Sequence, residues 1–243
     1  MHGNTLLVAA LSLTACNLYS HALPDAAIVD AVDAPHVTTE ITIAGTVTRD
    51  DDPGTPVAGM LVAAKQLDDD SLAGSSLTTS NGTFQIVVQT PQGVADVYLM
   101  AVGSGFVDTY YDFRTELVTD NDVTIDAFTP AAYAALYSAA DVAAAPTDGT
   151  MRVRSRTYDG MPIAGATAHT FSGSGTVVYD SGSGQPDPNA TSTSFDGLAY
   201  VLNATTDVVF VQPVDYQELE SREARVFPGA MTELELTTGP GGD

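Results

Sequence analysis

The same pattern of residues occurs twice in this chain of 243 residues. Each copy has a strand-like run, an acidic turn, a Pro-x-Ala-Gly element and a second strand-like run. Residues 46–63 read TVTRDDDPGTPVAGMLVA, and residues 153–168 read VRSRTYDGMPIAGATA. Matched landmarks keep a near-constant separation: Gly59 and Gly165 (106 residues), Gly82 and Gly197 (115 residues), and Phe106 and Tyr216 (110 residues). Ordered matches at such spacing indicate a tandem duplication of one folding unit.

Within each copy, short runs of β-branched and aromatic residues alternate with turn-forming residues. In the first copy these runs cover residues 40–47, 60–64, 84–88, 97–102 and 123–128. Asn81-Gly82 and Asp196-Gly197 fit tight turns between strands, because glycine adopts a positive φ without strain. The pattern predicts an all-β fold of two tandem Greek-key β-sandwich domains.

The segment between the two copies has helical character. Thr129-Pro130 can provide the N-cap and the first residue of a helix. Residues at helical spacing then share one face: Tyr133, Leu136, Tyr137 and Ala140. We therefore expect a short helical connector that packs against one sandwich. The predicted domains are a first sandwich over 40–128, a connector over 129–149, a second sandwich over 150–238 and a tail over 239–243.

A second motif precedes an aromatic or apolar strand in both copies. The first copy has Asn81-Gly82-Thr83-Phe84 and later Gly105-Phe106; the second has Asp196-Gly197-Leu198-Ala199-Tyr200, with Asp215-Tyr216 in place of Gly-Tyr. Together with the Pro-x-Ala-Gly elements, these residues resemble the carboxypeptidase regulatory-like, or transthyretin-like, β-sandwich family over about residues 40–128 and 150–238. The resemblance implies the fold and leaves the function open, because such modules serve many proteins.

The first residues have features of an export signal. Residues 6–13 (LLVAALSL) form an apolar run well short of the roughly 20 residues that span a bilayer, although residues 1–5 lack the usual lysine or arginine. The run ends at Leu13-Thr14-Ala15-Cys16, which resembles the lipobox of bacterial lipoproteins. The resemblance implies a signal peptide over 1–15 and a diacylglycerol anchor on Cys16, the single cysteine. The expected location is the cell envelope, on an inner or outer membrane.

Residues 16–39 are expected to form a flexible acidic tether, because they are rich in alanine, aspartate and proline without lasting periodicity. A short amphipathic helix is the alternative, and Pro24 and Pro35 would interrupt it. A flexible chain of about 20 residues reaches roughly 25 Å. Such a tether would hold the first sandwich clear of the lipid headgroups.

The charge of the chain excludes polyanionic partners. The sequence has 31 acidic and 8 basic residues and a formal net charge of -23. A surface of this sign repels nucleic acid and anionic membrane surfaces. We therefore predict no nucleic-acid partner.

The residues that carry catalytic chemistry are scattered. His2 lies in the signal, His21 and His36 lie in the tether, and His169 stands alone in a predicted strand. The sequence has no HExxH and no Gly-x-Ser-x-Gly motif, and Cys16 would be consumed by lipid. The chain also lacks the C-terminal tetrapeptide of related transthyretin-like hydrolases. No catalytic residue is predicted.

Two features of the sequence bear on a covalent cross-link or a bound metal. The single lysine, Lys65, lies in the second predicted strand, where it does not fit the isopeptide bond of collagen-adhesin repeats. Residues 50–52 (DDD), 68–70 (DDD) and 120–122 (DND) place carboxylates in predicted loops, without the spacing of a known calcium motif. Solvated turns are the expectation and calcium is the alternative, so no metal or cofactor residue is predicted.

The function expected from the sequence is that of a non-catalytic envelope lipoprotein whose tandem sandwiches act as a spacer or protein-interaction module. A carbohydrate-binding lipoprotein is the alternative, with an envelope protein or a glycan as the unknown partner. The chain has no tryptophan, so a sugar-stacking platform would rest on tyrosines: Tyr98, Tyr110, Tyr111, Tyr158, Tyr179 and Tyr200. Strand tyrosines more commonly pack in the core or across strands. An envelope hydrolase is a third, weaker hypothesis.

Overall fold

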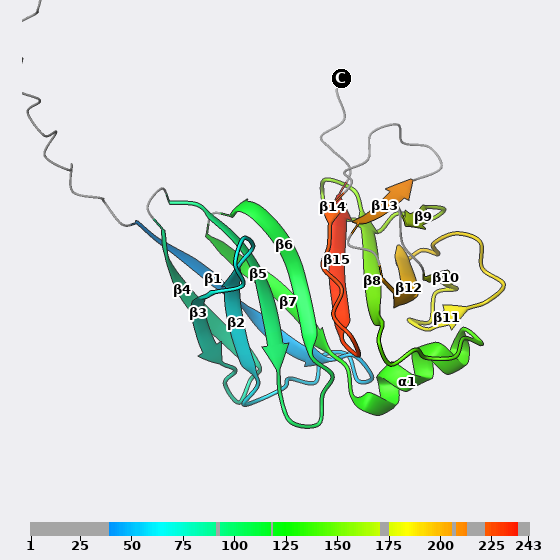
Figure 1. Ribbon diagram of the computed structural model, residues 1–243, viewed down its shortest axis with the longest axis horizontal. Coiled ribbons are helices and arrows are strands. Elements are labelled where there is room, and N and C mark those ends of the chain that lie inside the picture. Colours follow the sequence, from blue (N-terminus) through cyan, green and yellow to red (C-terminus); the bar gives the residue numbers. More distant parts are fainter. Residues whose placement is uncertain are drawn as a thin grey trace, which may run out of the picture. The chain divides into compact units, whose positions relative to one another are not determined.

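The computed structural model describes residues 39–90, 93–117, 119–170, 175–205, 208–212 and 222–237. Over these residues the fold is all-β apart from one short helix (Figure 1). The strands of the first half, here called the first module (residues 39–127), are β1 (Thr39–Arg49), β2 (Leu61–Gln66), β3 (Leu72–Leu77), β4 (Thr83–Thr90), β5 (Ala95–Val102), β6 (Thr109–Leu117) and β7 (Asp120–Ala127).

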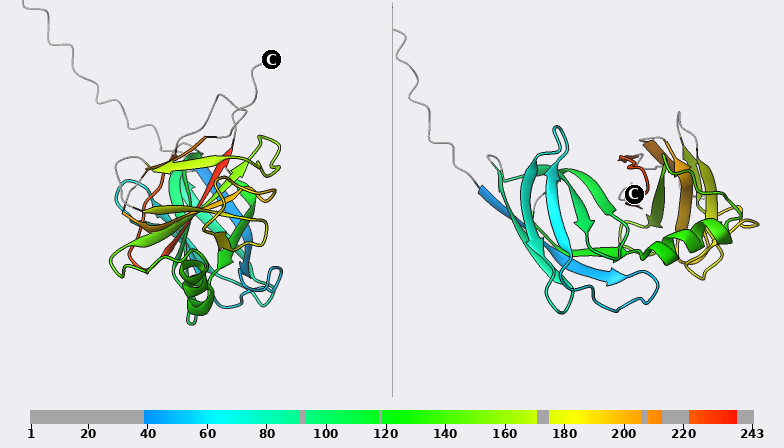
Figure 2. Two further views of the ribbon diagram at one scale, coloured as in Figure 1. Left: turned by 90° about the vertical axis from the view of Figure 1, so that its right-hand side faces the viewer. Right: turned by 60° about the horizontal axis from the view of Figure 1, so that its bottom comes forward.

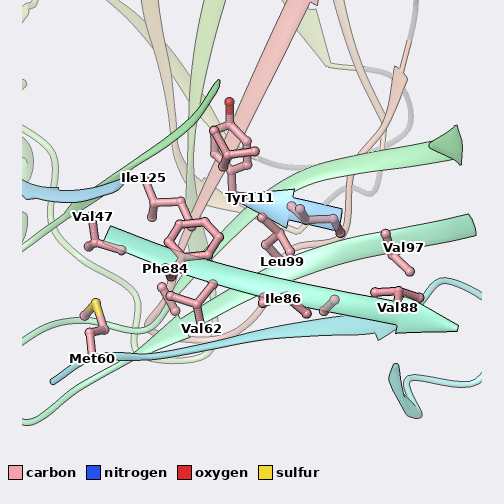
Figure 3. Close-up of a cluster of buried hydrophobic side chains, with 14 of the residues drawn as sticks. Val47, Met60, Val62, Phe84, Ile86, Val88, Val97, Leu99, Tyr111 and Ile125 are labelled. Atoms are coloured by element: carbon pink, nitrogen blue, oxygen red, sulfur yellow. The ribbon is translucent and has the colours of Figure 1, made fainter. Parts of the chain in front are cut away.

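The first module is a sandwich with one apolar core. One sheet has the order β4-β1-β7, and the other runs β6-β5-β2-β3. Side chains on β4 alternate, so that Phe84, Ile86 and Val88 are buried while the residues between them face solvent. They meet residues of the opposite sheet, among them Val62 and Leu99, in the core shown in Figure 3.

The second half, here called the second module (residues 149–237), repeats this arrangement. Its strands are β8 (Gly149–Arg156), β9 (Thr167–Thr170), β10 (Thr176–Asp180), β11 (Pro186–Asp187), β12 (Leu198–Ala204), β13 (Val208–Gln212), β14 (Arg222–Glu223) and β15 (Met231–Thr237). β8 pairs antiparallel with β12 and parallel with β15, as β1 does with β4 and β7. β9 pairs with β13 as β2 does with β5. The tandem β-sandwich fold is confirmed.

Single hydrogen bonds are also repeated between the modules. The amide of Met60 donates to Thr78 Oγ1 at 2.9 Å, and the amide of Ala166 donates to Thr193 Oγ1 at 2.9 Å. Gly82 and Gly197, the turn glycines identified in the sequence, have φ of 72° and 71°. One strand differs: β3 pairs with β2, whereas β10 pairs with β12 in the other sheet.

The connector contains α1 (Pro130–Ala139), and the Thr129 side chain accepts a hydrogen bond from the amide of Ala132. Leu136 and Tyr137 are buried against Tyr200 and other residues of the second module. The predicted helix (Figure 2) is thus confirmed, together with its cap and its apolar face. Within the part of the chain that the structure describes, no helix is long and apolar enough to cross a membrane.

The two modules share one sheet, which the sequence did not predict. β6 of the first module pairs in parallel with β15 of the second, with Thr109 opposite Met231 and Tyr111 opposite Glu233. This pairing joins strands of both modules into a nine-stranded sheet of order β11-β10-β12-β8-β15-β6-β5-β2-β3 (Figure 1). We refer to the β6–β15 contact and its surrounding side chains as the junction.

Three expectations about local structure were wrong. Residues 120–122, expected in a loop, form the beginning of β7. Asp50, expected in a solvated turn, has a side chain only 13% exposed. Tyr158, grouped with strand tyrosines, lies in the turn after β8 and is 72% exposed.

Candidate functional site

Cys16, the predicted lipidation site, lies outside the described residues, as do the signal peptide and the tether up to residue 38. His169 is exposed on β9. Among the residues that the structure describes, no group of three or more His, Cys, Asp or Glu side chains is placed to hold a metal ion. The charged residues that do gather are found at the junction.

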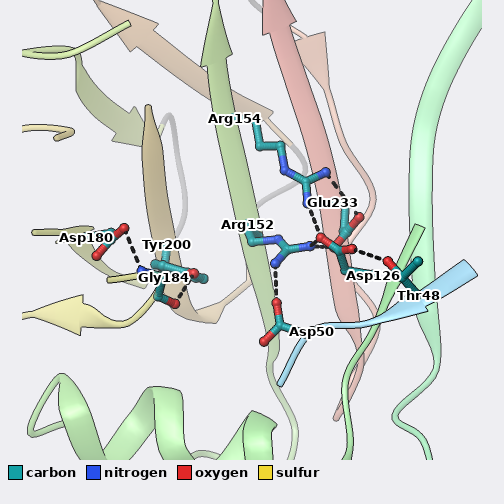
Figure 4. A network of polar contacts seen from close by, with 9 residues as sticks. All are labelled: Thr48, Asp50, Asp126, Arg152, Arg154, Asp180, Gly184, Tyr200 and Glu233. Atoms are coloured by element: carbon teal, nitrogen blue, oxygen red, sulfur yellow. Dashed lines mark hydrogen bonds and ion pairs between the residues drawn. The ribbon is translucent and has the colours of Figure 1, made fainter. Parts of the chain in front are cut away.

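A cluster of two arginines and three carboxylates fills one side of the junction (Figure 4). Arg152 Nη1 contacts Asp50 Oδ1 at 2.5 Å, and its Nη2 contacts Asp126 Oδ2 at 2.5 Å and also Glu233. Arg154 contacts the same Asp126 and lies 3.6 Å from Glu233 Oε2. Asp50 and Asp126 belong to the first module, so this ionic cluster bridges the two.

The strand register explains how the ionic cluster is assembled. Alternate residues of a strand point to the same face, so Arg152, Arg154 and Arg156 form a row on β8. Glu233 of β15 lies directly opposite Arg152 in the parallel ladder, and Glu235 lies opposite Arg154. Asp50 follows the end of β1 and Asp126 lies near the end of β7.

Burial makes the ionic cluster energetically important. The side chains of Arg152 and Glu233 are 3% and 2% exposed, and charges removed from water need partners. Burial lowers the pKa of Arg152, but the charges of Glu233 and Asp126 outweigh it and the pKa is raised. The Arg152 guanidinium also lies 4.7 Å from the centre of the Phe128 ring.

The pKa values of the three carboxyl groups in the ionic cluster shift in different directions. Burial raises the pKa of Asp50 and Glu233 more than the nearby arginines lower it. At Asp126 burial also raises the pKa, but Arg152 and Arg154 prevail and the pKa is lowered. The arginines therefore hold Asp126 in its charged form most firmly, and this residue is shared by both of them.

A second set of contacts lies elsewhere at the junction. Arg225 of the second module pairs with Asp70 and donates to the carbonyl oxygen of Leu67. Tyr98 donates to the same Asp70 at 3.0 Å and packs in the core of the second module although it belongs to β5. Burial first, and then the Asp70 hydrogen bond, raise the pKa of Tyr98 to about 12.

Aromatic rings complete this second set. Tyr110 of β6 stacks on Phe227 of the second module with ring centres 3.8 Å apart. Stacked or tilted aromatic pairs contribute about 0.5–1.5 kcal/mol beyond their buried area. The junction therefore combines backbone pairing, buried charge and apolar packing.

A buried acidic residue stabilises a loop inside the second module. Asp180 is fully buried, and its carboxylate accepts the amides of Gly182, Ser183 and Gly184 at 2.9 Å each. The hydroxyl of Tyr200 donates to the carbonyl oxygen of Gly184 at 2.9 Å (Figure 4). These hydrogen bonds satisfy Asp180 internally, and they assign it a structural role.

The first module has a shallow cavity of about 330 Å³ at the end where β2 and β4 finish and β5 begins. None of its lining residues is aromatic: Gln66, Leu67, Asp68, Gln89, Thr90, Val94, Ala95 and Asp96. A sugar would therefore find no ring to stack on there.

Comparison with known proteins identifies no family for this chain. No protein-family model matches the sequence, and no curated protein matches it either. Among solved structures, the Bacillus anthracis TIE protein is similar with 9% identity and a TM-score of 0.29, covering 83% of this chain. The chain spans only 34% of that protein.

Two pilins are also similar at this level. Shaft pilin SpaA from Lactobacillus rhamnosus GG has 9% identity and a TM-score of 0.26, with 85% of this chain and 99% of the pilin covered. A streptococcal ancillary pilin has 14% identity and a TM-score of 0.25, with 83% and 63% covered.

The junction was not predicted from the sequence, although one sequence pattern pointed to an ionic contact. Three of only 8 basic residues alternate along a single predicted strand as Arg152, Arg154 and Arg156. In a chain with 31 acidic residues, such a row points to carboxylates from another part of the fold. Which carboxylates these are depends on the pairing of β15 with β6 and β8, and no local pattern specifies that pairing.

Proposed function

We propose that this chain is a lipid-anchored protein of the bacterial cell envelope, attached through Cys16, whose two carboxypeptidase regulatory-like modules act as a non-catalytic spacer and protein-interaction unit. The anchor, the tether and the family rest on the resemblances described above. The two modules would together present a binding surface at a defined distance from the membrane.

The observation that carries the spacer role is the junction. Domains within one chain are expected to move relative to each other unless their interface is large and well packed. Here β6 pairs with β15, and Arg152 buries its charge against Asp50 and Asp126 of the other module. A spacer of fixed geometry needs such a contact, whereas two independent binding modules do not.

The anchor predicts a specific change when its thiol is removed. Wild-type protein expressed in a bacterial host should partition into the detergent phase of a Triton X-114 extraction, because buried acyl chains contribute about 0.8 kcal/mol per methylene. The Cys16→Ala variant should lose the lipid-modified mass and should no longer be processed before residue 16.

Cys16→Ala removes the acceptor thiol and leaves residues 6–13 intact, so the changes in mass and in N-terminal processing report on lipidation. A Thr14→Ser variant keeps a small residue before the cysteine and serves as the matched control, which should partition like wild type. Wild-type protein found wholly in the aqueous phase with an unmodified N-terminus would contradict the lipoprotein assignment. The spacer role would survive that result, because it rests on the junction.

A further inference from the structure

Three large apolar side chains are exposed at one end of the second module. Tyr158 is 72% exposed and Met161 is 58% exposed, both in the turn between β8 and β9, and Phe195 is 73% exposed in the turn before β12. The two turns are in contact, since a β carbon on Gly197 would lie 3.3 Å from Cβ of Pro162. We call these three residues the apolar tip.

The first module shows that the fold does not require the apolar tip. Its corresponding turn between β1 and β2 contains residues 50–54 (DDDPG), and Thr55 occupies the place of Met161 before the shared proline. Ser80 precedes Asn81-Gly82 as Phe195 precedes Asp196-Gly197. The same backbone therefore forms with polar residues at these places, and exposed apolar residues there suggest a binding role.

The same end of the first module is already an interface. Its turn after β1 supplies Asp50, and β7 supplies Asp126, which together bind Arg152 of the second module. At this end the first module therefore contacts the second through ion pairs between its carboxylates and an arginine. At the equivalent place in the second module, the exposed side chain of Tyr158 replaces Asp50, two residues beyond the bridge to the shared proline.

The charges around the apolar tip favour a basic partner. Asp159 lies between Tyr158 and Met161 and is exposed. Arg156, the basic residue next to this turn, is paired with Glu235 at 3.3 Å and donates to the carbonyl oxygen of Gly160 at 2.8 Å. With a net charge of -23, the chain would repel a second copy of itself and an anionic membrane.

We propose that the apolar tip is a docking surface for a basic protein segment, one whose apolar side chains contact Tyr158, Met161 and Phe195 on the two adjoining turns and whose lysine or arginine lies near Asp159. This inference rests on the proposed function, because it names the partner class of the interaction unit. Apolar contact supplies the affinity of such an interface, and the opposite charges speed association and set specificity.

The test uses a short amphipathic peptide of lysine and leucine as the probe, with a lysine–serine peptide of equal charge for comparison. The chain carrying Cys16→Ser, which is not lipidated, should bind the lysine–leucine peptide at least about tenfold more tightly in fluorescence anisotropy. A combined Tyr158→Ser, Met161→Thr and Phe195→Ser variant should lose that preference. Thr55 and Ser80 of the first module show that the fold accepts small polar residues at two of these places.

A matched control removes three exposed apolar side chains elsewhere without changing the charge. Leu72→Ser, Leu77→Ser and Val87→Ser alter residues of the first module that are 62%, 63% and 46% exposed, and this variant should bind like the parent chain. A double Tyr158→Ser and Met161→Thr variant leaves the Phe195 turn intact and should bind with intermediate affinity, which guards against misfolding of the triple variant.

Equal binding by the parent chain and the triple variant, or an equal loss in the control, would overturn the proposal. Binding to a glycan array that the triple variant loses, without any preference for the lysine–leucine peptide, would overturn it in favour of carbohydrate. Neither result bears on the lipid anchor or on the junction. A failure of the docking proposal is therefore distinct from a failure of the proposed function.

Discussion

Replacing Arg152 with alanine is expected to lower the free energy of unfolding by about 3–5 kcal/mol, because removing one partner of a buried ion pair leaves the other charge uncompensated. The charges left behind are those of Glu233, which is 2% exposed, and of Asp50, which is 13% exposed. Arg154 lies 3.6 Å from Glu233 Oε2 and compensates only in part. Urea denaturation of the chain carrying Cys16→Ser measures the change.

Two further variants distinguish the stability effect of the buried ionic cluster from that of an exposed ion pair. Arg49→Ala removes an arginine whose partner Asp51 is exposed, and it should leave the denaturation midpoint nearly unchanged. A combined Arg152→Leu and Glu233→Leu variant should recover part of the loss, since apolar residues often replace buried ion pairs without penalty, although Asp50 still loses its partner. If Arg152→Ala and Arg49→Ala gave the same small effect, the ionic cluster would not stabilise the junction.

The second module expressed alone, as residues 129–243, is expected to fold but to melt well below the intact chain. Separation removes the β6 partner of β15, the Tyr98 side chain from its core, and the carboxylates of Asp50 and Asp126. A loss of about 3 kcal/mol corresponds to roughly 10–20 °C for a domain of this size. Circular dichroism melting of both proteins gives the comparison.

The isolated module also provides a thermodynamic cycle. Once β6 is absent, Arg152 and Glu233 regain water, so Arg152→Ala should cost much less there than in the intact chain. The difference between the two costs measures the coupling across the junction. Equal costs in both proteins, together with equal melting temperatures, would show that the modules are independent.

Local structure followed from the sequence where one short motif is sufficient. Gly82 and Gly197 have the positive φ that their turns require, and Thr129 caps α1 as its type and position predict. The alternation along β4 likewise marked which side chains face the core. Each of these features is set by residues that are neighbours in the chain.

The junction could not be predicted in the same way, because it depends on surfaces that exist only after both modules have folded. Nothing local to Thr109 or Met231 specifies that they pair across more than a hundred residues. The acidic turn at residues 50–52 was interpreted as solvated, since its partner Arg152 is supplied by another module. The duplication gives no help here, because equivalent turns of the two modules have different neighbours in the folded chain.

If the junction fixes the two modules as one unit, the distance between them should have a single narrow distribution. Spin labels at Gln85→Cys on β4 and Thr176→Cys on β10, both exposed positions, report on the two modules once Cys16 is replaced by serine. We expect one narrow distribution in a double electron–electron resonance measurement, which Arg152→Ala broadens. A broad distribution in the parent chain, unchanged by Arg152→Ala, would show that the modules move independently and would contradict the spacer role.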